Sequence, residues 1–80
     1  MVGVGDETSD LIKDYYTHER ILTNLLQNYK GQKYYFYEYM RELVTMGKIL
    51  NHHLVRDKHD LKTRYQKLHT VVYNIYDYGE

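Results

Sequence analysis

The sequence predicts an all-α protein, either a small three-helix bundle or a long helical hairpin that self-associates. The chain of 80 residues has no proline, and beyond residue 5 its only glycines are Gly31, Gly47 and Gly79. So few helix breakers favour long helices. Apolar side chains also recur in alternating steps of three and four residues, which is typical of helices that pack at shallow angles. A chain of this length forms one domain at most, so we expect a single helical domain over residues 1–80.

The first helix is expected over residues 9–29, after a flexible N-terminal segment at residues 1–7. Thr8 or Ser9 can cap the helix, because their hydroxyl oxygens accept hydrogen bonds from free backbone N–H groups. Asp10 suits the positive end of the helix dipole. The predicted apolar seam of this helix consists of Leu11, Tyr15, His18, Leu22, Leu25 and Tyr29.

Gly31 marks the turn after the first helix, because glycine adopts the left-handed conformation that often follows a helix, and Lys30 suits the last turn. The second helix is expected over residues 33–54. Its predicted seam consists of Phe36, Met40, Leu43, Gly47, Leu50 and Leu54. Gly47 would allow another helix to approach closely, although a glycine inside a helix costs about 1 kcal/mol relative to alanine.

The third helix is expected over residues 57–77, with Asp57 as its N-cap and Asp60 in its first turn. Asp60 and Arg64 form a well-oriented i,i+4 pair. Its predicted seam consists of Leu61, Tyr65, Leu68, Val72 and Ile75. The start signal is weak, so the sequence leaves open whether the second and third helices are continuous.

A competing interpretation treats residues 33–39 as a β-strand, because Tyr35, Tyr37 and Tyr39 alternate and aromatic residues favour strands. A single strand needs a partner strand, and no second segment has strand character. We therefore prefer the helical interpretation.

The charge pattern bears on possible partners. The formal net charge is zero, from eleven basic and eleven acidic side chains. Residues 1–19 carry five acidic side chains and one lysine, whereas residues 30–67 carry nine basic and four acidic ones. A chain with ends of opposite charge could pair with itself or steer a partner.

No membrane association is expected, because no apolar run approaches the roughly 18–20 residues of a membrane span. The first ten residues lack the basic and apolar regions of a signal peptide, and the chain has no cysteine. We therefore expect a soluble, cytoplasmic protein without disulfides.

A metal site is conceivable only if the second and third helices are continuous. His53, Asp57 and Asp60 would then share one helix face and could bind zinc or a similar ion. The spacing matches no established ligand motif, so we prefer surface histidines and expect no metal and no cofactor. His18 on the first seam is interpreted as a hydrogen-bonded histidine or a pH-sensitive contact.

Catalysis has little support in the sequence. Ser9 is the single serine and stands near a predicted helix cap, and a nucleophilic cysteine is absent. The glycines of the first five residues follow no strand, so they do not match a phosphate-binding loop. We therefore expect no enzymatic activity.

Nucleic-acid binding by a regulatory protein is the alternative function. Tyrosines among basic side chains could stack on unpaired bases while lysine and arginine hold phosphates. The candidate residues are Lys30, Lys33, Arg41, Lys48, Arg56, Lys58, Lys62 and Arg64. The zero net charge and the lack of a known reader motif argue against this alternative.

Protein association is the preferred prediction, through an adaptor, inhibitor or assembly subunit that binds a protein partner, itself, or both. Eleven tyrosines are present, and interfaces favour tyrosine and arginine. At about 100° per residue, the aromatic residues of positions 34–39 point all round a helix, so one seam cannot bury them all. The candidate contact residues are Tyr34, Tyr35, Tyr37, Tyr39, Arg41 and Met46. Of these, Tyr35, Tyr39 and Met46 are expected to be exposed anchors.

Overall fold

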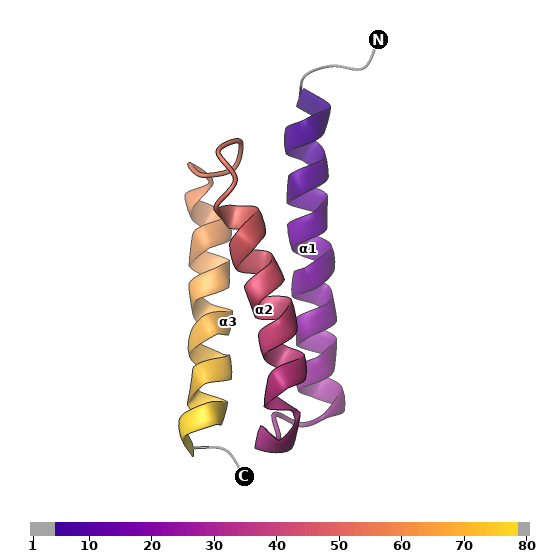
Figure 1. The fold of residues 1–80 in the computed structure, drawn as a ribbon, viewed down its shortest axis with the longest axis vertical. Helices are drawn as coiled ribbons and strands as arrows, with labels where there is room; N and C mark the ends of the chain where they lie inside the picture. Colours follow the sequence, from indigo (N-terminus) through magenta and orange to yellow (C-terminus); the bar gives the residue numbers. More distant parts are fainter. Residues whose placement is uncertain (1–4, 79–80) are drawn as a thin grey trace.

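The computed structural model describes residues 5–78, with side chains from residue 7 onward. Three α-helices, α1 (Gly5–Asn28), α2 (Phe36–Leu50) and α3 (His59–Tyr78), pack as antiparallel neighbours (Figure 1). A short 3₁₀ helix, η1 (Lys33–Tyr35), leads into α2. The predicted all-α bundle is confirmed, and α2 and α3 are separate helices.

α1 begins earlier than expected. The helix already includes Gly5, so Thr8 and Ser9 lie inside it, and the prediction that one of them is the N-cap is wrong. No helix breaker stands between Gly5 and Ser9, and Glu7 favours the positive end of the helix dipole. The predicted flexible segment is therefore helical from residue 5, and its residues 1–4 lie outside the described part.

The turn after α1 is a Schellman motif. The N–H of Gly31 donates to the carbonyl of Leu26 at 3.0 Å, and the N–H of Lys30 donates to the carbonyl of Gln27 at 3.3 Å. Gly31 has φ +63°, which confirms its predicted left-handed conformation. Lys30 also has a positive φ, +54°, and occupies the position of the motif where glycine is most common.

α2 lies between α1 and α3 and contributes to both packing surfaces. One stripe, which continues from Tyr35 of η1 and has Glu42 at its edge, faces α1. Tyr35 stacks on Tyr29 with ring centroids 3.8 Å apart, and the Nδ1 of His18 donates to Glu42 Oε1 at 2.7 Å. The fully or nearly fully buried core consists of Tyr15, Leu22, Tyr39, Leu43, Met46, Leu50, Leu61 and Val72. The predicted seams of α1 and α3 are at least partly buried along their whole length.

The other stripe of α2 faces α3, and Gly47 lies there beside Tyr65 of α3. A Cβ atom at position 47 would lie 2.9 Å from the hydroxyl oxygen of Tyr65 and 3.4 Å from its Cζ. The tip of the Tyr65 side chain therefore occupies the space that a side chain at position 47 would need.

The connection between α2 and α3 is longer than expected. α2 ends at Leu50, and α3 begins at His59, so residues 51–58 form a loop. Val55 is fully buried and anchors this loop. The first turn of α3 closes with a bond from the Lys62 N–H to the Lys58 carbonyl, so Lys58, and not Asp57, stands at the N-cap position.

Candidate functional site

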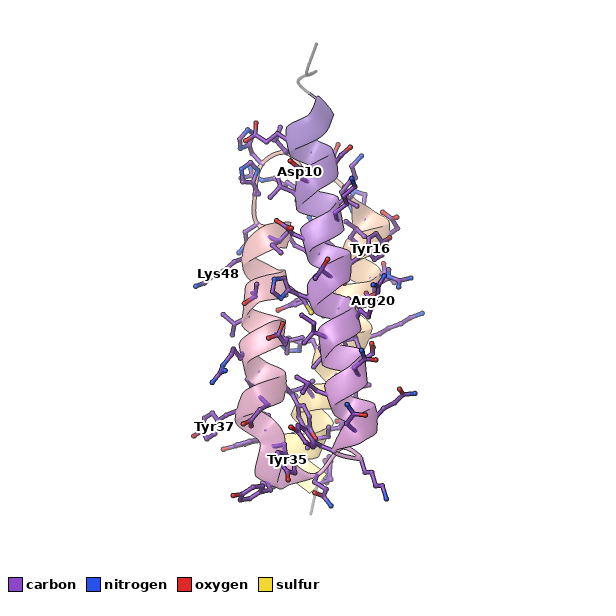
Figure 2. All side chains as sticks on the ribbon, turned by 90° about the vertical axis from the view of Figure 1, so that its right-hand side faces the viewer. Asp10, Tyr16, Arg20, Tyr35, Tyr37 and Lys48 are labelled. Carbon is purple, nitrogen blue, oxygen red and sulfur yellow. The ribbon has the colours of Figure 1, made fainter. Side chains whose placement is uncertain are left out.

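The structure divides the predicted tyrosine surface between solvent and core. Tyr34 and Tyr37 are 82% and 81% exposed, and Tyr35 is half-buried against Tyr29. In Figure 2, Tyr37 points away from the bundle. Tyr39 and Met46 are fully buried and Tyr35 is partly buried, so the expectation that these three are exposed anchors is wrong. The physical reason is that the central helix packs against two neighbours and needs two apolar stripes, whereas the predicted seam provides only one.

The hydroxyl group of Tyr39 is also turned into the protein and not toward solvent. Its hydroxyl oxygen is buried and has no hydrogen-bond partner among the described residues. Desolvation by burial raises the pKa of Tyr39 above its ordinary value. This residue therefore belongs to the core.

Aromatic side chains of α2 and α3 meet on the side of the bundle away from α1 and form a continuous cluster, the aromatic patch. The patch consists of Phe36, Tyr37, His69, Tyr73 and Tyr76. Phe36 is its centre, with ring centroids 6.1 Å from Tyr37, 6.4 Å from Tyr73 and 5.0 Å from Tyr76. His69 stacks on Tyr73 at 4.4 Å. Tyr37, Tyr73 and Tyr76 remain exposed although they touch other rings.

The patch continues into a longer surface, which we call the α2–α3 face. Each helix contributes one stripe in steps of three and four residues, on the flank opposite α1. The face consists of Tyr37, Arg41, Val44 and Lys48 on α2 and Lys62, Gln66, His69, Tyr73 and Tyr76 on α3. Val44 is 47% exposed, so apolar surface continues beyond the aromatic patch. Tyr37 and Lys48 point to the same side of α2 in Figure 2.

The α2–α3 face is positively charged. Arg41, Lys48 and Lys62 belong to it, and the Nζ of Lys33 lies 5.5 Å from the ring centroid of Tyr76, in cation–π geometry. None of these four cations forms an ion pair within residues 7–78. Asp77 lies at the edge of the face, and Glu38 is turned about 100° away from Tyr37 around α2.

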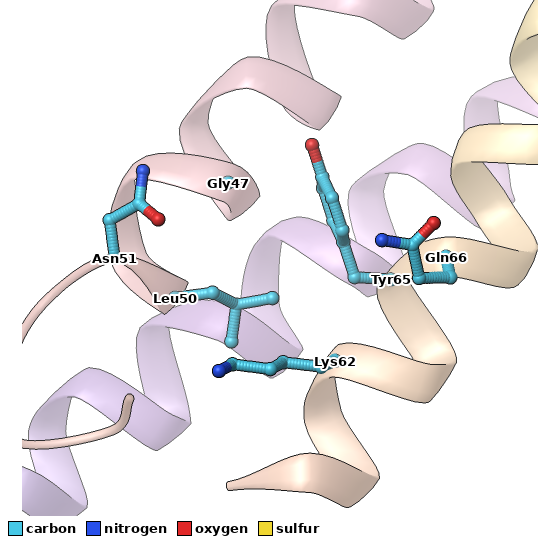
Figure 3. A pocket seen from close by; sticks show the side chains of 6 residues that line it. All are labelled: Gly47, Leu50, Asn51, Lys62, Tyr65 and Gln66. Atoms are coloured by element: carbon cyan, nitrogen blue, oxygen red, sulfur yellow. The ribbon is translucent and has the colours of Figure 1, made fainter. Parts of the chain in front are cut away.

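A hollow of about 250 Å³ opens on the α2–α3 face beside Gly47 (Figure 3). Leu50, Asn51, Lys62, Tyr65 and Gln66 form its walls. The ammonium group of Lys62 and the two side-chain amides supply hydrogen-bond donors at its rim. Desolvation by burial raises the pKa of Tyr65, so its hydroxyl remains a neutral donor. These groups suit a single carboxylate better than a cation.

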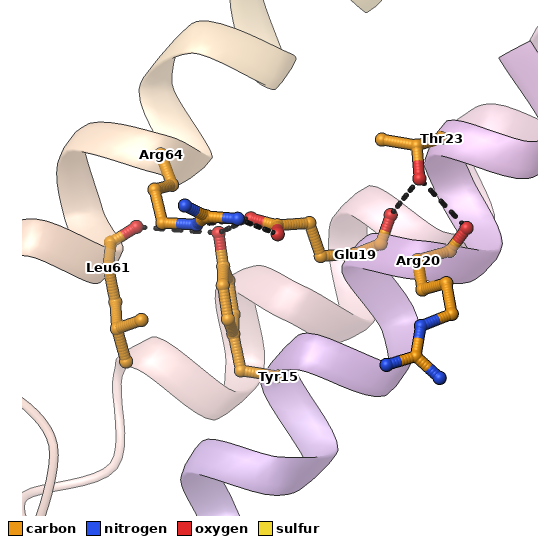
Figure 4. A network of polar contacts seen from close by, with 6 residues as sticks. All are labelled: Tyr15, Glu19, Arg20, Thr23, Leu61 and Arg64. Carbon is orange, nitrogen blue, oxygen red and sulfur yellow. Dashed lines mark hydrogen bonds and ion pairs between the residues drawn. The ribbon is translucent and has the colours of Figure 1, made fainter.

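Arg64, a candidate in the nucleic-acid alternative, forms an intramolecular ion pair with Glu19 (Figure 4). Its Nε donates to Glu19 Oε2 at 3.0 Å, and a second guanidinium nitrogen donates to Glu19 Oε1. Glu19 also accepts a hydrogen bond from the Tyr15 hydroxyl at 3.1 Å, and the Leu61 carbonyl lies 3.4 Å from the same hydroxyl. Burial and then the charge of Glu19 raise the pKa of Tyr15, whereas Glu19 raises the pKa of Arg64. This network joins α1 to α3.

The remaining cations of the nucleic-acid alternative lie at opposite ends of the bundle. Lys30 belongs to the turn after α1, whereas Arg56 and Lys58 belong to the loop before α3 (Figure 1). The longest dimension of the molecule is 51 Å. Lys33, Arg41, Lys48 and Lys62 are therefore spread along the α2–α3 face, with Lys30 near Lys33 at one end of the bundle and Lys58 one turn before Lys62 at the other. Arg64 differs from these cations, because it pairs with Glu19 of α1.

The metal-ligand set considered as an alternative, His53, Asp57 and Asp60, is not assembled. It required a continuous helix from His53 to Asp60, and the loop at residues 51–58 breaks that helix. His53 stacks on His52 with ring centroids 4.6 Å apart, and His52 Nδ1 accepts a hydrogen bond from the Leu54 N–H at 3.2 Å. Within the described part of the chain, no three acidic, histidine or cysteine side chains lie together as a metal-binding group.

Sequence reasoning missed part of the surface. It placed Phe36 in the seam alone, and it did not include His69, Tyr73 and Tyr76 among the candidate contact residues. A usable signal was present, because positions 62, 66, 69, 73 and 76 form a second stripe beside the α3 seam. What the sequence could not reveal is that this stripe lies next to the one through Tyr37.

Comparisons with protein families, with characterised proteins and with solved structures find no match to this chain. Among residues 5–78, none of the helices combines the length and the apolar character needed to cross a membrane. Inferences about function therefore depend on the residues and their arrangement.

Proposed function

We propose that this protein is a small helical interaction module that binds a protein partner through the α2–α3 face. The observation that carries this proposal is the aromatic patch, in which exposed tyrosines of two helices form one surface. Tyrosine combines a large apolar contact area with a polar tip and few rotatable bonds, so it contributes strongly to protein interfaces.

The size of the exposed aromatic surface supports this function. Tyr37, Tyr73 and Tyr76 in the patch, with Tyr34 and Tyr78 at the same end of the bundle, are between 40% and 82% exposed. An aromatic side chain buries about 150–250 Å² in a contact, so these five could contribute roughly 500–850 Å². A typical stable interface buries about 800 Å² on each partner.

Site-specific photo-crosslinking tests this proposal. The photoreactive residue p-benzoyl-phenylalanine replaces Tyr37 or Tyr76, and in a control chain it replaces Asn24, an exposed residue of α1. In cells of the native source, we expect adducts at positions 37 and 76 that protease removes and nuclease does not, with no adduct at position 24. Circular dichroism establishes that each chain is helical.

Two outcomes would contradict the proposal. Equal labelling from positions 24 and 37 would mean that the α2–α3 face has no special role. Adducts that nuclease removes would favour the nucleic-acid alternative.

A further inference from the structure

We infer that the partner of the α2–α3 face is an acidic amphipathic helix. This inference rests on the proposed function and specifies the chemistry of the partner. It comes from the charge on the face, the shape between the two helices and the donors around the hollow beside Gly47.

Charge complementarity points to an acidic partner. Lys33, Arg41, Lys48 and Lys62 surround the apolar surface without intramolecular ion pairs among residues 7–78, so a partner can supply the missing anions. Complementary charges across an interface speed association and suppress wrong partners. Carboxylates flanking an apolar stripe would meet these cations on both sides of the aromatic patch.

The shape of the surface points to a helix. The stripe from Tyr37 to Lys48 extends about 16 Å along α2, or three helical turns. α3 packs beside it, so the two stripes form one elongated surface, and the hollow beside Gly47 opens between them. An elongated surface with an apolar stripe suits an amphipathic helix. A helix on this surface would pack against α2 and α3 on the side opposite α1, and would complete a four-helix arrangement.

The hollow beside Gly47 would then hold one acidic side chain of the partner. Lys62, Asn51 and Gln66 provide donors at its rim, and Tyr65 lines it. A carboxylate with several donors is bound more strongly than an exposed ion pair. The aromatic patch would anchor the other end of the helix.

Two other occupants are less consistent with the surface. A nucleic acid would need several open aromatic faces and an excess of positive charge, whereas His69 and Tyr73 stack on each other and the formal net charge of the chain is zero. Tyr37 is the most exposed ring of the patch. A second copy of the chain could offer its acidic first half, but Leu11 and Ile12 of that segment are already half-buried in their own bundle. Among residues 7–19, Tyr16 is the exposed large apolar side chain, and one such residue does not make a stripe.

Binding of designed peptides tests the inference. Two fluorescent helical peptides share one leucine stripe and carry either glutamate or lysine at every other exposed position. A single-stranded oligonucleotide of similar charge is the third probe. By fluorescence anisotropy, we expect the glutamate peptide to bind at least about tenfold more tightly than the lysine peptide, with an affinity that falls as salt screens the charges.

Charge reversal locates the site. Arg41→Glu with Lys48→Glu should weaken binding of the glutamate peptide by about tenfold or more. Lys13→Glu with Arg20→Glu changes the net charge of the chain equally but alters exposed residues of α1, so it should leave the affinity nearly unchanged. Both variants replace exposed helical side chains, and circular dichroism checks that they fold.

Several results would overturn the inference: equal binding of the two peptides, equal loss in both double variants, or tighter binding of the oligonucleotide than of the glutamate peptide. A dimer in sedimentation experiments that Arg41→Glu with Lys48→Glu abolishes would assign the face to a second copy instead. If the crosslinking experiment gave protease-sensitive adducts at position 37 but the protein bound both peptides equally, the proposed function would stand and the acidic helix would be rejected.

Discussion

Replacing Gly47 with alanine sets two effects of opposite sign against each other. Alanine is more favourable than glycine inside a helix by about 1 kcal/mol, because glycine loses more backbone entropy on folding. The new Cβ, however, would lie 2.9 Å from the hydroxyl oxygen of Tyr65, closer than van der Waals contact allows. Overpacking of this kind typically costs about 1–3 kcal/mol. We therefore expect Gly47→Ala to destabilise the protein by about 1 kcal/mol.

The sign should reverse in a chain that already carries Tyr65→Phe. With the hydroxyl removed, the nearest ring atom to the new Cβ is Cζ at 3.4 Å, which is an ordinary contact. The helix propensity of alanine then acts alone, and Gly47→Ala should stabilise the Tyr65→Phe variant by about 1 kcal/mol. The coupling between the two positions is therefore about 2 kcal/mol.

Thermal and urea unfolding of the four chains, followed by circular dichroism, measures this coupling. In a domain of this size, 1 kcal/mol shifts Tm by about 4–8 °C, so both signs are readily measured. If Gly47→Ala changed Tm by the same amount and sign in both backgrounds, Tyr65 would not limit the approach of α2 and α3. The close contact between position 47 and the Tyr65 hydroxyl would then be wrong.

Three further changes address single side chains. Tyr39→Phe should stabilise the fold by about 1 kcal/mol, because it removes a buried hydroxyl that has no partner among the described residues. Tyr15→Phe should destabilise the fold by about 1 kcal/mol, because it removes the hydrogen bond to Glu19. Urea unfolding compares the two variants, and equal effects would contradict the different pairing of the two hydroxyls. Lys30→Gly should raise the free energy of unfolding by about 0.5–1 kcal/mol, because glycine adopts the positive φ of this position without steric cost. A lower Tm in this variant would count against the left-handed conformation of Lys30. Burial raises the pKa of Tyr15 in the folded state, so stability should be complete below about pH 10, where the unfolded tyrosine is still neutral, and should fall as pH rises through the folded pKa. Unfolding titrations at alkaline pH should show a smaller decline for Tyr15→Phe, and an unchanged decline would refute this assignment.

The outer helices were predictable because each has one main packing direction. On α1, the stripe from Leu11 to Tyr29 is at least partly buried, and on α3 the stripe from Leu61 to Ile75 is as well. The three- and four-residue steps carry this information directly. The left-handed conformation of Gly31 and the space beside Gly47 that Tyr65 occupies depend on the lack of a side chain, which the sequence also shows.

The central helix was harder to predict, because periodicity does not reveal which helix lies in the middle. Tyr39 and Met46 belong to a second stripe that is buried only because α1 covers it. The end of α2 at Leu50 was missed for a related reason. Residues 51–58 contain no proline or glycine, so the loop is stabilised by tertiary contacts such as the burial of Val55. The α2–α3 face likewise depends on which flanks of two helices become neighbours.

The central position of the second helix, both in the chain and in the bundle, has a consequence for folding kinetics. α2 packs against the helix before it and the helix after it, so most contacts connect segments close in sequence. Proteins with such local contacts typically fold within microseconds to milliseconds. The bond between Glu19 and Arg64 is an exception, because it joins residues 45 positions apart. It can form only after both hairpins have assembled, so we expect its loss to accelerate unfolding while leaving the folding rate nearly unchanged.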